Sequence, residues 1–272
     1  MFDALVREIV DGRVILFVGS GVSAGVGLPR WSGLIGHLGE ELGYEEEVFS
    51  SLSNSFPSLA QFYRNEKGSI GTLRDWMQRE WTVPDDKLLS FSAHQSIFEL
   101  GFQLVYTTNY DDLLERSFEL RGKKINKIVN VRDMPGIDYN APTIVKFHGD
   151  LADDNSLVLS ENDYFDRLAF SSPLDLKLQA DALGRTILFV GYSLSDINMR
   201  LMLYRIKSLW RASGFEAVRP RSYIFMPRPN AAQESVVESW GIEPIIGDRG
   251  DDVEALTSFL FELQSQVSAA RT

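Results

Sequence analysis

The run VILFVGSGVSAG, from Val14 to Gly25, decides the fold of this chain of 272 residues. Its first five residues are apolar without a break, which is typical of a central parallel strand covered on both faces. A glycine-rich turn follows, and Gly19-x-Gly21-x-x-Ala24 matches the fingerprint of turns that approach a pyrophosphate closely. The run predicts an α/β sheet with a phosphate-binding turn after its first strand. A purely structural glycine turn explains the fingerprint about equally well.

The residues after this turn argue against an ordinary NAD-dependent dehydrogenase. Gly25, Gly27 and Pro29 would end any helix within about one turn. No second strand carries an acidic residue about twenty positions further on, as the dehydrogenase crossover requires. We therefore expect a phosphate-binding turn followed by a loop that folds over a nucleotide.

Strand-like and helix-like runs alternate along the rest of the chain. This alternation predicts a Rossmann-like parallel sheet with helices on both faces. The predicted strands are Val14–Val18, Leu104–Thr107, Ile125–Val131, Ile144–Phe147, Ile187–Val190 and Tyr223–Met226.

Apolar periodicity and capping residues predict the main helices. The opening helix has Phe2, Leu5, Val6, Ile9 and Val10 on one face. A second helix runs from Asp112 to about Leu120 and is capped by Asn109 or Asp111. A third is capped by Asp196 and runs toward Trp210, and a closing helix runs from Val253 to Val267. The stretch from Ser32 to Ala93 has no strong strand signal, so we expect a mostly helical insertion over roughly residues 32–95 after the first strand. Without a repeat or linker, residues 1–272 are expected to form a single domain.

Composition narrows the class of protein. With 44% hydrophobic and 24% charged residues, the chain can bury a full core. It has no cysteine, which excludes disulfides and a thiolate zinc module, and we expect no metal. The formal net charge of −11 argues against nucleic acid as the main ligand, and Arg219, Arg221 and Arg228 are the best candidates for a local basic patch. No secretory signal or membrane span is visible, so a cytoplasmic location is expected.

Two further polar segments follow predicted strands. TTNYD runs from Thr107 to Asp111, and KFHGD runs from Lys146 to Asp150. In a parallel sheet both would lie at the same edge as the glycine turn. They add an asparagine, a carboxylate and a histidine, so the three segments together predict a dinucleotide substrate rather than a passive ligand.

These segments resemble the motifs of the sirtuin (silent information regulator) family. GSGVSAGVGLPRW (Gly19 to Trp31), TTNYD, FHGD and GYSL (Gly191 to Leu194) match the four sirtuin motifs in order and spacing. The resemblance extends over roughly Val14 to Met226, which is most of the chain.

The resemblance implies a role for each matching residue. Asn109 would position the nicotinamide ribose of NAD and an attacking water, Asp111 would hold the nicotinamide carboxamide, and His148 would act as general base. Thr108 stands where sirtuins carry a glutamine and is grouped with the NAD-binding residues. The other predicted NAD contacts are Gly19, Ser20, Gly21 and Ser23 at the pyrophosphate, Pro29, Arg30 and Trp31 in the loop over the ribose, and Gly191 and Ser193 at the adenosine side.

Structural roles remain as alternatives. Asn109 and Asp111 also suit a turn and a helix cap, and His148 also suits a packing or capping position. His94 lies within an amphipathic run and is expected to be structural, whereas His37 is left without a role.

Departures from the sirtuin pattern point to one branch of the family. No cysteines follow the His-Gly motif, and Ser32 stands where sirtuins usually carry an arginine. TTNYDDLLE, LSENDYF, FVGYSLSDINMR and WGIEPIIGD resemble the bacterial sirtuin-like NAD hydrolases of anti-phage defence. This resemblance implies cleavage of NAD to nicotinamide and ADP-ribose, with a sensor subunit or a homo-oligomer as regulator. A protein deacylase, an ADP-ribosyltransferase and a non-catalytic nucleotide sensor are the alternatives.

Overall fold

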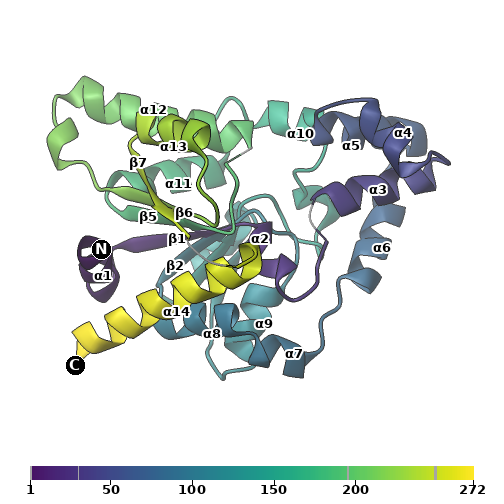
Figure 1. Cartoon of the computed structure of the whole chain (residues 1–272). Coiled ribbons are helices and arrows are strands. Elements are labelled where there is room, and N and C mark those ends of the chain that lie inside the picture. The colour runs from purple at the N-terminus through teal and green to yellow at the C-terminus, as the bar shows by residue number, and fades with distance from the viewer. Residues whose placement is uncertain (1, 30, 195, 248–249) are drawn as a thin grey trace.

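The structure, a computed structural model, describes residues 2–29, 31–194, 196–247 and 250–272. Seven parallel strands form one sheet in the order β3-β4-β2-β1-β5-β6-β7. Their bounds are β1 Val14–Val18, β2 Leu104–Thr107, β3 Asn126–Ile128, β4 Thr143–Lys146, β5 Thr186–Val190, β6 Ser222–Met226 and β7 Ile242–Ile246. The predicted parallel α/β sheet is confirmed (Figure 1).

Strand β1 lies at the centre and is buried on both faces. Val14, Leu16 and Val18 belong to one hydrophobic cluster, and Ile15 and Phe17 belong to the other. This alternation explains why the strand has no polar position, because successive side chains point to opposite faces and both faces are covered.

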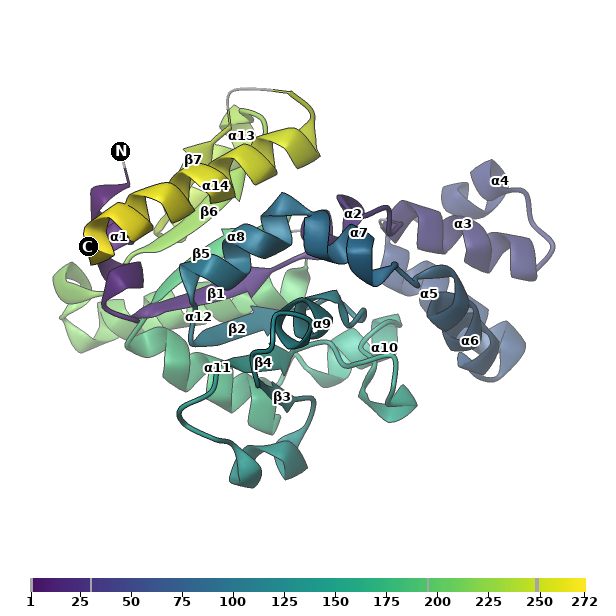
Figure 2. The ribbon, with the colours of Figure 1, turned by 90° about the horizontal axis from the view of Figure 1, so that it is seen from below.

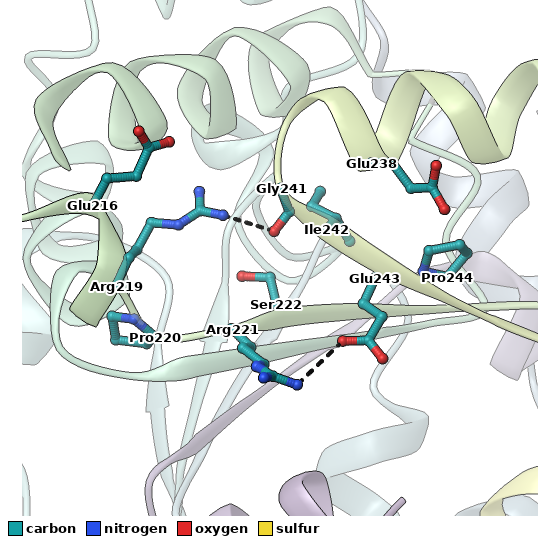
Figure 3. A pocket seen from close by; sticks show the side chains of 10 residues that line it. All are labelled: Glu216, Arg219, Pro220, Arg221, Ser222, Glu238, Gly241, Ile242, Glu243 and Pro244. Atoms are coloured by element: carbon teal, nitrogen blue, oxygen red, sulfur yellow. Dashed lines mark hydrogen bonds and ion pairs between the residues drawn. The ribbon is translucent and has the colours of Figure 1, made fainter. Parts of the chain in front are cut away.

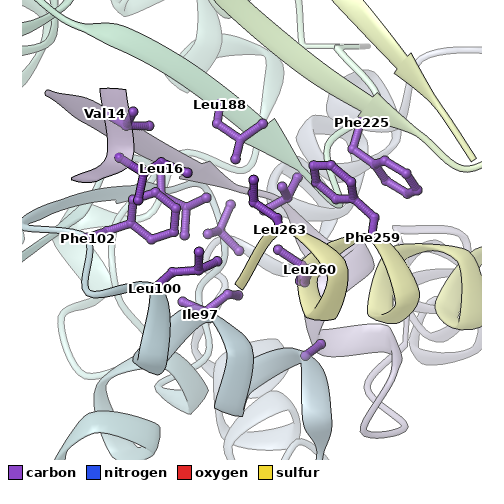
Figure 4. Close-up of a cluster of buried hydrophobic side chains, with 14 of the residues drawn as sticks. Val14, Leu16, Ile97, Leu100, Phe102, Leu188, Phe225, Phe259, Leu260 and Leu263 are labelled. Atoms are coloured by element: carbon purple, nitrogen blue, oxygen red, sulfur yellow. The ribbon is translucent and has the colours of Figure 1, made fainter. Parts of the chain in front are cut away.

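Helices cover both faces of the sheet, as Figures 1 and 2 show. One face packs against α1 (Asp3–Val10), α8 (Ser92–Leu100), α9 (Leu113–Glu119) and α14 (Asp252–Arg271). The other packs against α11 (Pro173–Leu183), α12 (Ile197–Ser213) and α13 (Ala231–Ser239). Figure 4 shows the first cluster, in which Leu260 and Leu263 of α14 meet Ile97 and Leu100 of α8 beneath the strands.

The predicted helical insertion is confirmed. It comprises α3 (Trp31–Glu41), α4 (Glu46–Ser51), α5 (Phe56–Lys67), α6 (Gly71–Glu80) and α7 (Asp85–Ser90), and the short helix α2 (Ser20–Ala24) precedes it. Helices α3 to α6 extend beyond the carboxyl ends of the strands and have their own core. That core also includes Tyr110, Leu151, Leu157 and Leu159, from the loops after β2 and β4. Helix α8 instead belongs to the sheet layer.

Two strands differ from their predictions. Strand β3 is shorter than the predicted strand Ile125–Val131. The 3-10 helix η1 (Val131–Gly136) begins at Val131, the last residue of the predicted strand. Strand β7 was not predicted, since Pro244 lies at its middle. Proline is tolerated there because β7 is the edge strand and its free side needs no N–H donor.

The remaining short elements are η2 (Asp154–Ser156), α10 (Glu161–Asp166) and η3 (Glu216–Val218). In the ranges that the structure describes, no helix combines the length and the apolarity needed to cross a bilayer.

Candidate active site

The predicted site segments meet at the carboxyl ends of four neighbouring strands. In sheet order these are β4, β2, β1 and β5, and the segments that follow them begin at Phe147, Thr108, Gly19 and Gly191. The chain leaves β1 toward β2 and leaves β5 toward β6, on opposite sides. Ligands of open parallel sheets usually bind outside the strand ends at such a reversal.

The turns after β1 and β5 touch through their backbones. The amides of Gly19 and Gly21 donate to the carbonyl oxygens of Val190 and Gly191, both at 2.9 Å. A Cβ atom at Gly21 would lie 2.8 Å from the Gly191 Cα, so neither turn has room for a side chain here. These two amides are engaged within the protein. The pyrophosphate role of the turn, including part-exposed Ser20, stays a prediction.

Asn109 is buried, and residues of the glycine-rich turn after β1 hold its side chain. Its Nδ2 donates to the Gly19 carbonyl oxygen at 3.2 Å and to Ser23 Oγ at 3.0 Å. Its own amide donates to Thr107 Oγ1 at 3.0 Å. The Oδ1 atom is buried and has no hydrogen-bond partner in the part of the chain that the structure describes. An unsatisfied buried acceptor costs roughly 1–3 kcal/mol, so its retention here is consistent with a ligand group bonding to it.

Asp111 has both a structural and an electrostatic role. Its Oδ1 accepts from the amide of Leu113, the first residue of α9, at 3.2 Å, but the N-cap residue of that helix is Asp112 and not the predicted Asn109 or Asp111. Burial raises the pKa of its carboxyl, and the charge of Lys146 and a hydrogen bond with Ser23 only partly oppose this.

A buried ionic cluster lies behind these residues. Lys146 is fully buried, and its Nζ bonds the Asp111 carbonyl oxygen and lies 3.3 Å from Glu115 Oε1. Asp150 Oδ2 lies 3.9 Å from the same Nζ and 2.9 Å from Lys127 Nζ. Burial raises the pKa of Glu115, against the opposing charge of Lys146. The sequence reasoning named Lys146 only as part of KFHGD, without a role.

His148 is paired with a carboxylate that the sequence reasoning had identified only as a helix cap. Its Nε2 lies 3.1 Å from Asp196 Oδ2, and the two side chains are 3% and 9% exposed. Tyr192 donates its hydroxyl to the same oxygen at 3.2 Å. The imidazole lies edge-on to Tyr164 and alongside Phe147, so aromatic rings restrict its rotation.

Gly149 fixes the backbone next to His148. Its φ of +91° lies in the region that favours glycine, and a Cβ there would lie 2.7 Å from Ser156 Oγ and clash with the Ser156 carbonyl. The His148 carbonyl accepts from the Val158 amide at 2.9 Å, so the segment after η2 packs directly beneath the histidine.

The other predicted NAD contacts lie in the loop after α2, after β2 and on the adenosine side. Arg30 lies outside the described residues. Trp31 is half-buried in the insertion, where it stacks on Phe56 at 6.2 Å and meets Tyr110 edge-on at 6.4 Å. The remaining predicted contacts, Pro29, Thr108 and Ser193, are at least partly exposed near the same strand ends.

The other two histidines lie in different environments. His94 is 1% exposed and packs against Phe91, as the structural prediction requires. Burial lowers its pKa to about 4, with a further contribution from Arg121. His37 stacks on Trp76 at 3.7 Å and lies 3.0 Å from Glu41 Oε1, within the insertion.

The candidate basic residues do not form a uniformly basic patch. Arg219 and Arg221 line a cavity of about 340 Å³ near the amino ends of β6 and β7, together with Glu216, Glu238 and Glu243. Figure 3 shows Arg219 bonded to the Gly241 carbonyl and Arg221 facing Glu243. Arg228 pairs with Asp252 at 3.0 Å. Over the described ranges, no group of three histidine, aspartate or glutamate side chains is arranged to hold a metal ion.

Several proteins of known name are similar to this chain in sequence. "NAD(+) hydrolase ThsA" of Bacillus cereus (strain MSX-D12) is 28% identical over 206 residues, which are 75% of this chain and 42% of that protein. The Enterococcus faecium protein of the same name is 30% identical over 209 residues, with the same two coverages. "Defense-associated sirtuin 2" of Bacillus subtilis is 28% identical over 76% of this chain and 21% of its own length. The chain thus spans about half the length, or less, of the curated relatives it matches.

A family model gives the assignment of this chain. A solved chain described as "Structural Basis for the Mechanism and Regulation of Sir2 Enzymes" aligns over 98% of this chain at 17% identity, and its TM-score of 0.45 is too low to support any argument. The model of the SIR2-like domain matches residues 103–245, which is more than half of the sequence. This chain therefore belongs to the SIR2-like domain family.

Proposed function

We propose that this protein is an NAD+ glycohydrolase. The bond between the nicotinamide nitrogen and ribose C1′ breaks and water adds to C1′, so NAD+ and water give nicotinamide, ADP-ribose and a proton. The observation that carries the proposal is the buried Oδ1 of Asn109 at the strand ends, which has no hydrogen-bond partner among the described residues. It is a fixed acceptor for a ribose hydroxyl or for the attacking water.

Each of the three polar residues has a role in this reaction. Asn109 orients the ribose and the water, and its dipole stabilises positive charge as the glycosidic bond breaks. Asp111 holds the nicotinamide carboxamide. His148 accepts a proton from a ribose hydroxyl or from water, a type of assistance that typically contributes about 10²–10⁴-fold. Ser23 supports the pyrophosphate turn and also anchors Asn109.

We further propose that the protein depletes NAD+ in the cytoplasm as the effector of an anti-phage defence system. The names of its relatives support this, since four NAD(+) hydrolases and a defense-associated sirtuin match it. Such an enzyme must be silent until it is triggered, so a sensor subunit or a homo-oligomer would control it. Purification alone and together with the products of neighbouring genes tests this control. Full activity of an isolated monomer would contradict it.

Nicotinamide release from NAD+ tests the reaction itself. We expect release by the wild-type protein without any added acceptor, and loss of release in Asn109→Ala and His148→Ala. Gly184→Ala is the matched control, because Gly184 lies before β5 at the opposite edge of the sheet and a Cβ there meets no atom within 4 Å.

The same assay separates the alternatives. A deacylase or ADP-ribosyltransferase would consume NAD+ only after an acetylated peptide or a protein acceptor is added. A nucleotide sensor would bind NAD+ without turnover. If both site variants retained wild-type activity, the assignment of the site would be wrong.

A further inference from the structure

His148 and Asp196 meet at the carboxyl ends of the strands, although they come from distant parts of the sheet. His148 follows β4 and Asp196 precedes α12, after β5. Strands β2 and β1 lie between β4 and β5, so the two strand ends are roughly 14 Å apart at the usual strand spacing. Nevertheless His148 Nε2 and Asp196 Oδ2 lie 3.1 Å apart. The pair therefore bridges the strand ends that flank Asn109.

The two oxygens of Asp196 have separate partners. Oδ1 accepts from the amides of Asn198 at 2.8 Å and Met199 at 3.3 Å, and so caps α12. Oδ2 faces His148 and accepts the Tyr192 hydroxyl. The cap fixes the carboxylate at the start of a helix of 17 residues, so the oxygen that faces the histidine is held in place.

The environment keeps this carboxylate charged. Burial opposes the charge of Asp196, but the facing His148 imidazole and the amides of Asn198 and Met199 outweigh it, so its pKa is lowered. A carboxylate can only accept hydrogen bonds, so it favours the tautomer in which the facing imidazole nitrogen carries the proton. The nitrogen and oxygen meet the distance of an ion pair but not the alignment of a hydrogen bond. Such bonds often align only when substrate is bound.

We propose that Asp196 is a positioning residue that holds the His148 imidazole with its proton on Nε2 and thereby presents Nδ1 to the substrate. This inference rests on the proposed role of His148 as general base. In the reaction Nδ1 takes the proton of a ribose hydroxyl or of water, the imidazole becomes positively charged, and the facing carboxylate stabilises that charge until the proton leaves to solvent.

Asp196→Asn separates this role from the helix cap. Asparagine caps a helix about as well as aspartate, but it carries no charge and its amide can also donate to the ring. We expect kcat for nicotinamide release to fall roughly 10²–10⁴-fold, while KM and Tm stay close to wild type. The matched control is Asp251→Asn at the cap of α14, where Oδ1 accepts from the amides of Val253 and Glu254 and faces no histidine. Its kcat should be unchanged.

A second measurement does not depend on turnover. The chain has three histidines, so ¹⁵N labelling of histidine gives few ring signals, and His148→Gln identifies the one of interest. We expect His148 to show a protonated Nε2 in the wild type and a mixture of tautomers in Asp196→Asn. An unprotonated Nε2 in the wild type, or wild-type kcat in Asp196→Asn, would overturn the proposal. If the tautomer behaves as expected but NAD+ is not cleaved, the proposed function fails and the pairing of Asp196 with His148 stands.

Discussion

Ser23 Oγ lies 3.0 Å from Asn109 Nδ2, and this bond sets which end of the Asn109 amide is left without a partner in the protein. With Nδ2 held by Ser23 and by the Gly19 carbonyl, Oδ1 is the atom left for a ligand. Rotation of the amide by 180° would present a donor instead. The glycine turn thus orients the asparagine as well as carrying a phosphate-binding pattern.

Ser23→Ala should therefore reduce activity through Asn109. The variant keeps the backbone of the turn but leaves Nδ2 with one of its two partners, so the amide is less firmly held. We expect kcat for nicotinamide release to fall about tenfold and the free energy of unfolding to fall by about 1 kcal/mol, as for a typical lost hydrogen bond. Ser51→Ala, an exposed serine on α4 that bonds only the Val48 carbonyl, should change neither quantity by a comparable amount. Wild-type kcat in Ser23→Ala would contradict the anchoring role.

Gly149→Ala should destabilise the protein strongly. Alanine adopts the φ of +91° poorly, and its Cβ would clash with Ser156. We expect a loss of about 3 kcal/mol in the free energy of unfolding, from strain and from displacement of the segment beneath His148. Urea denaturation measures this loss. Gly184→Ala, at an ordinary φ and with open space around its Cβ, should lose less than about 1 kcal/mol. Equal effects of the two substitutions would show that the clash is relieved at little cost.

Lys146→Met should destabilise the protein, because it leaves excess negative charge in the buried ionic cluster. Removal of the cation leaves Glu115 without the charge that offsets its burial, and the Asp111 carbonyl loses a donor, whereas Asp150 keeps its pair with Lys127. Breaking a buried pair in this way costs roughly 3–5 kcal/mol. The double variant Lys146→Met/Glu115→Gln should be more stable than Lys146→Met alone, because the second change removes the uncompensated carboxylate. Additive losses in denaturation experiments would mean that the two side chains are not coupled.

The stability of the protein should depend on His94 between pH 7 and pH 5. Burial lowers the pKa of His94 to about 4, whereas in the unfolded chain it is near 6.5, so protonation favours the unfolded state in this range. The wild type should therefore lose about 2 kcal/mol of unfolding free energy from this group between pH 7 and pH 5.

His94→Leu isolates that contribution. Neither ring nitrogen of His94 has a hydrogen-bond partner among the residues described, so leucine removes no bond there. Compared with the wild type, the variant should lose about 2 kcal/mol less between pH 7 and pH 5 in urea denaturation. Equal losses of unfolding free energy in the wild type and in His94→Leu would show that His94 is not neutral and buried in the folded protein.

Much of the fold was predictable from local pattern. The apolar runs of β1 and β5 predict strands that are covered on both faces, and Asp196 predicts the start of α12. Strand β7 was missed because Pro244 disfavours a strand, and only its edge position in the finished sheet makes it acceptable. That position is a property of the tertiary structure and has no local signal.

The site was predictable in its members but not in its pairings. Parallel strands bring Asn109, Asp111 and His148 to one edge of the sheet whenever each follows a strand. The pairing of His148 with Asp196 depends on how α12 is placed after β5, which no spacing in the sequence encodes. The burial of Lys146 likewise becomes visible only once α9 covers it. Roles of the individual residues toward NAD+ remain predictions that the experiments above test.

The hydrophobic cluster shared by the insertion and the strand-end loops has a consequence for local unfolding. Tyr110 lies between Asn109 and Asp111 in sequence and packs among the side chains of α3 to α6. Opening of the insertion must therefore break contacts that also hold the TTNYD loop. The amides of that loop and of α5 should then exchange with deuterium as one cooperative unit, separately from the sheet. The free energy of that opening would set how often the loop loses its arrangement.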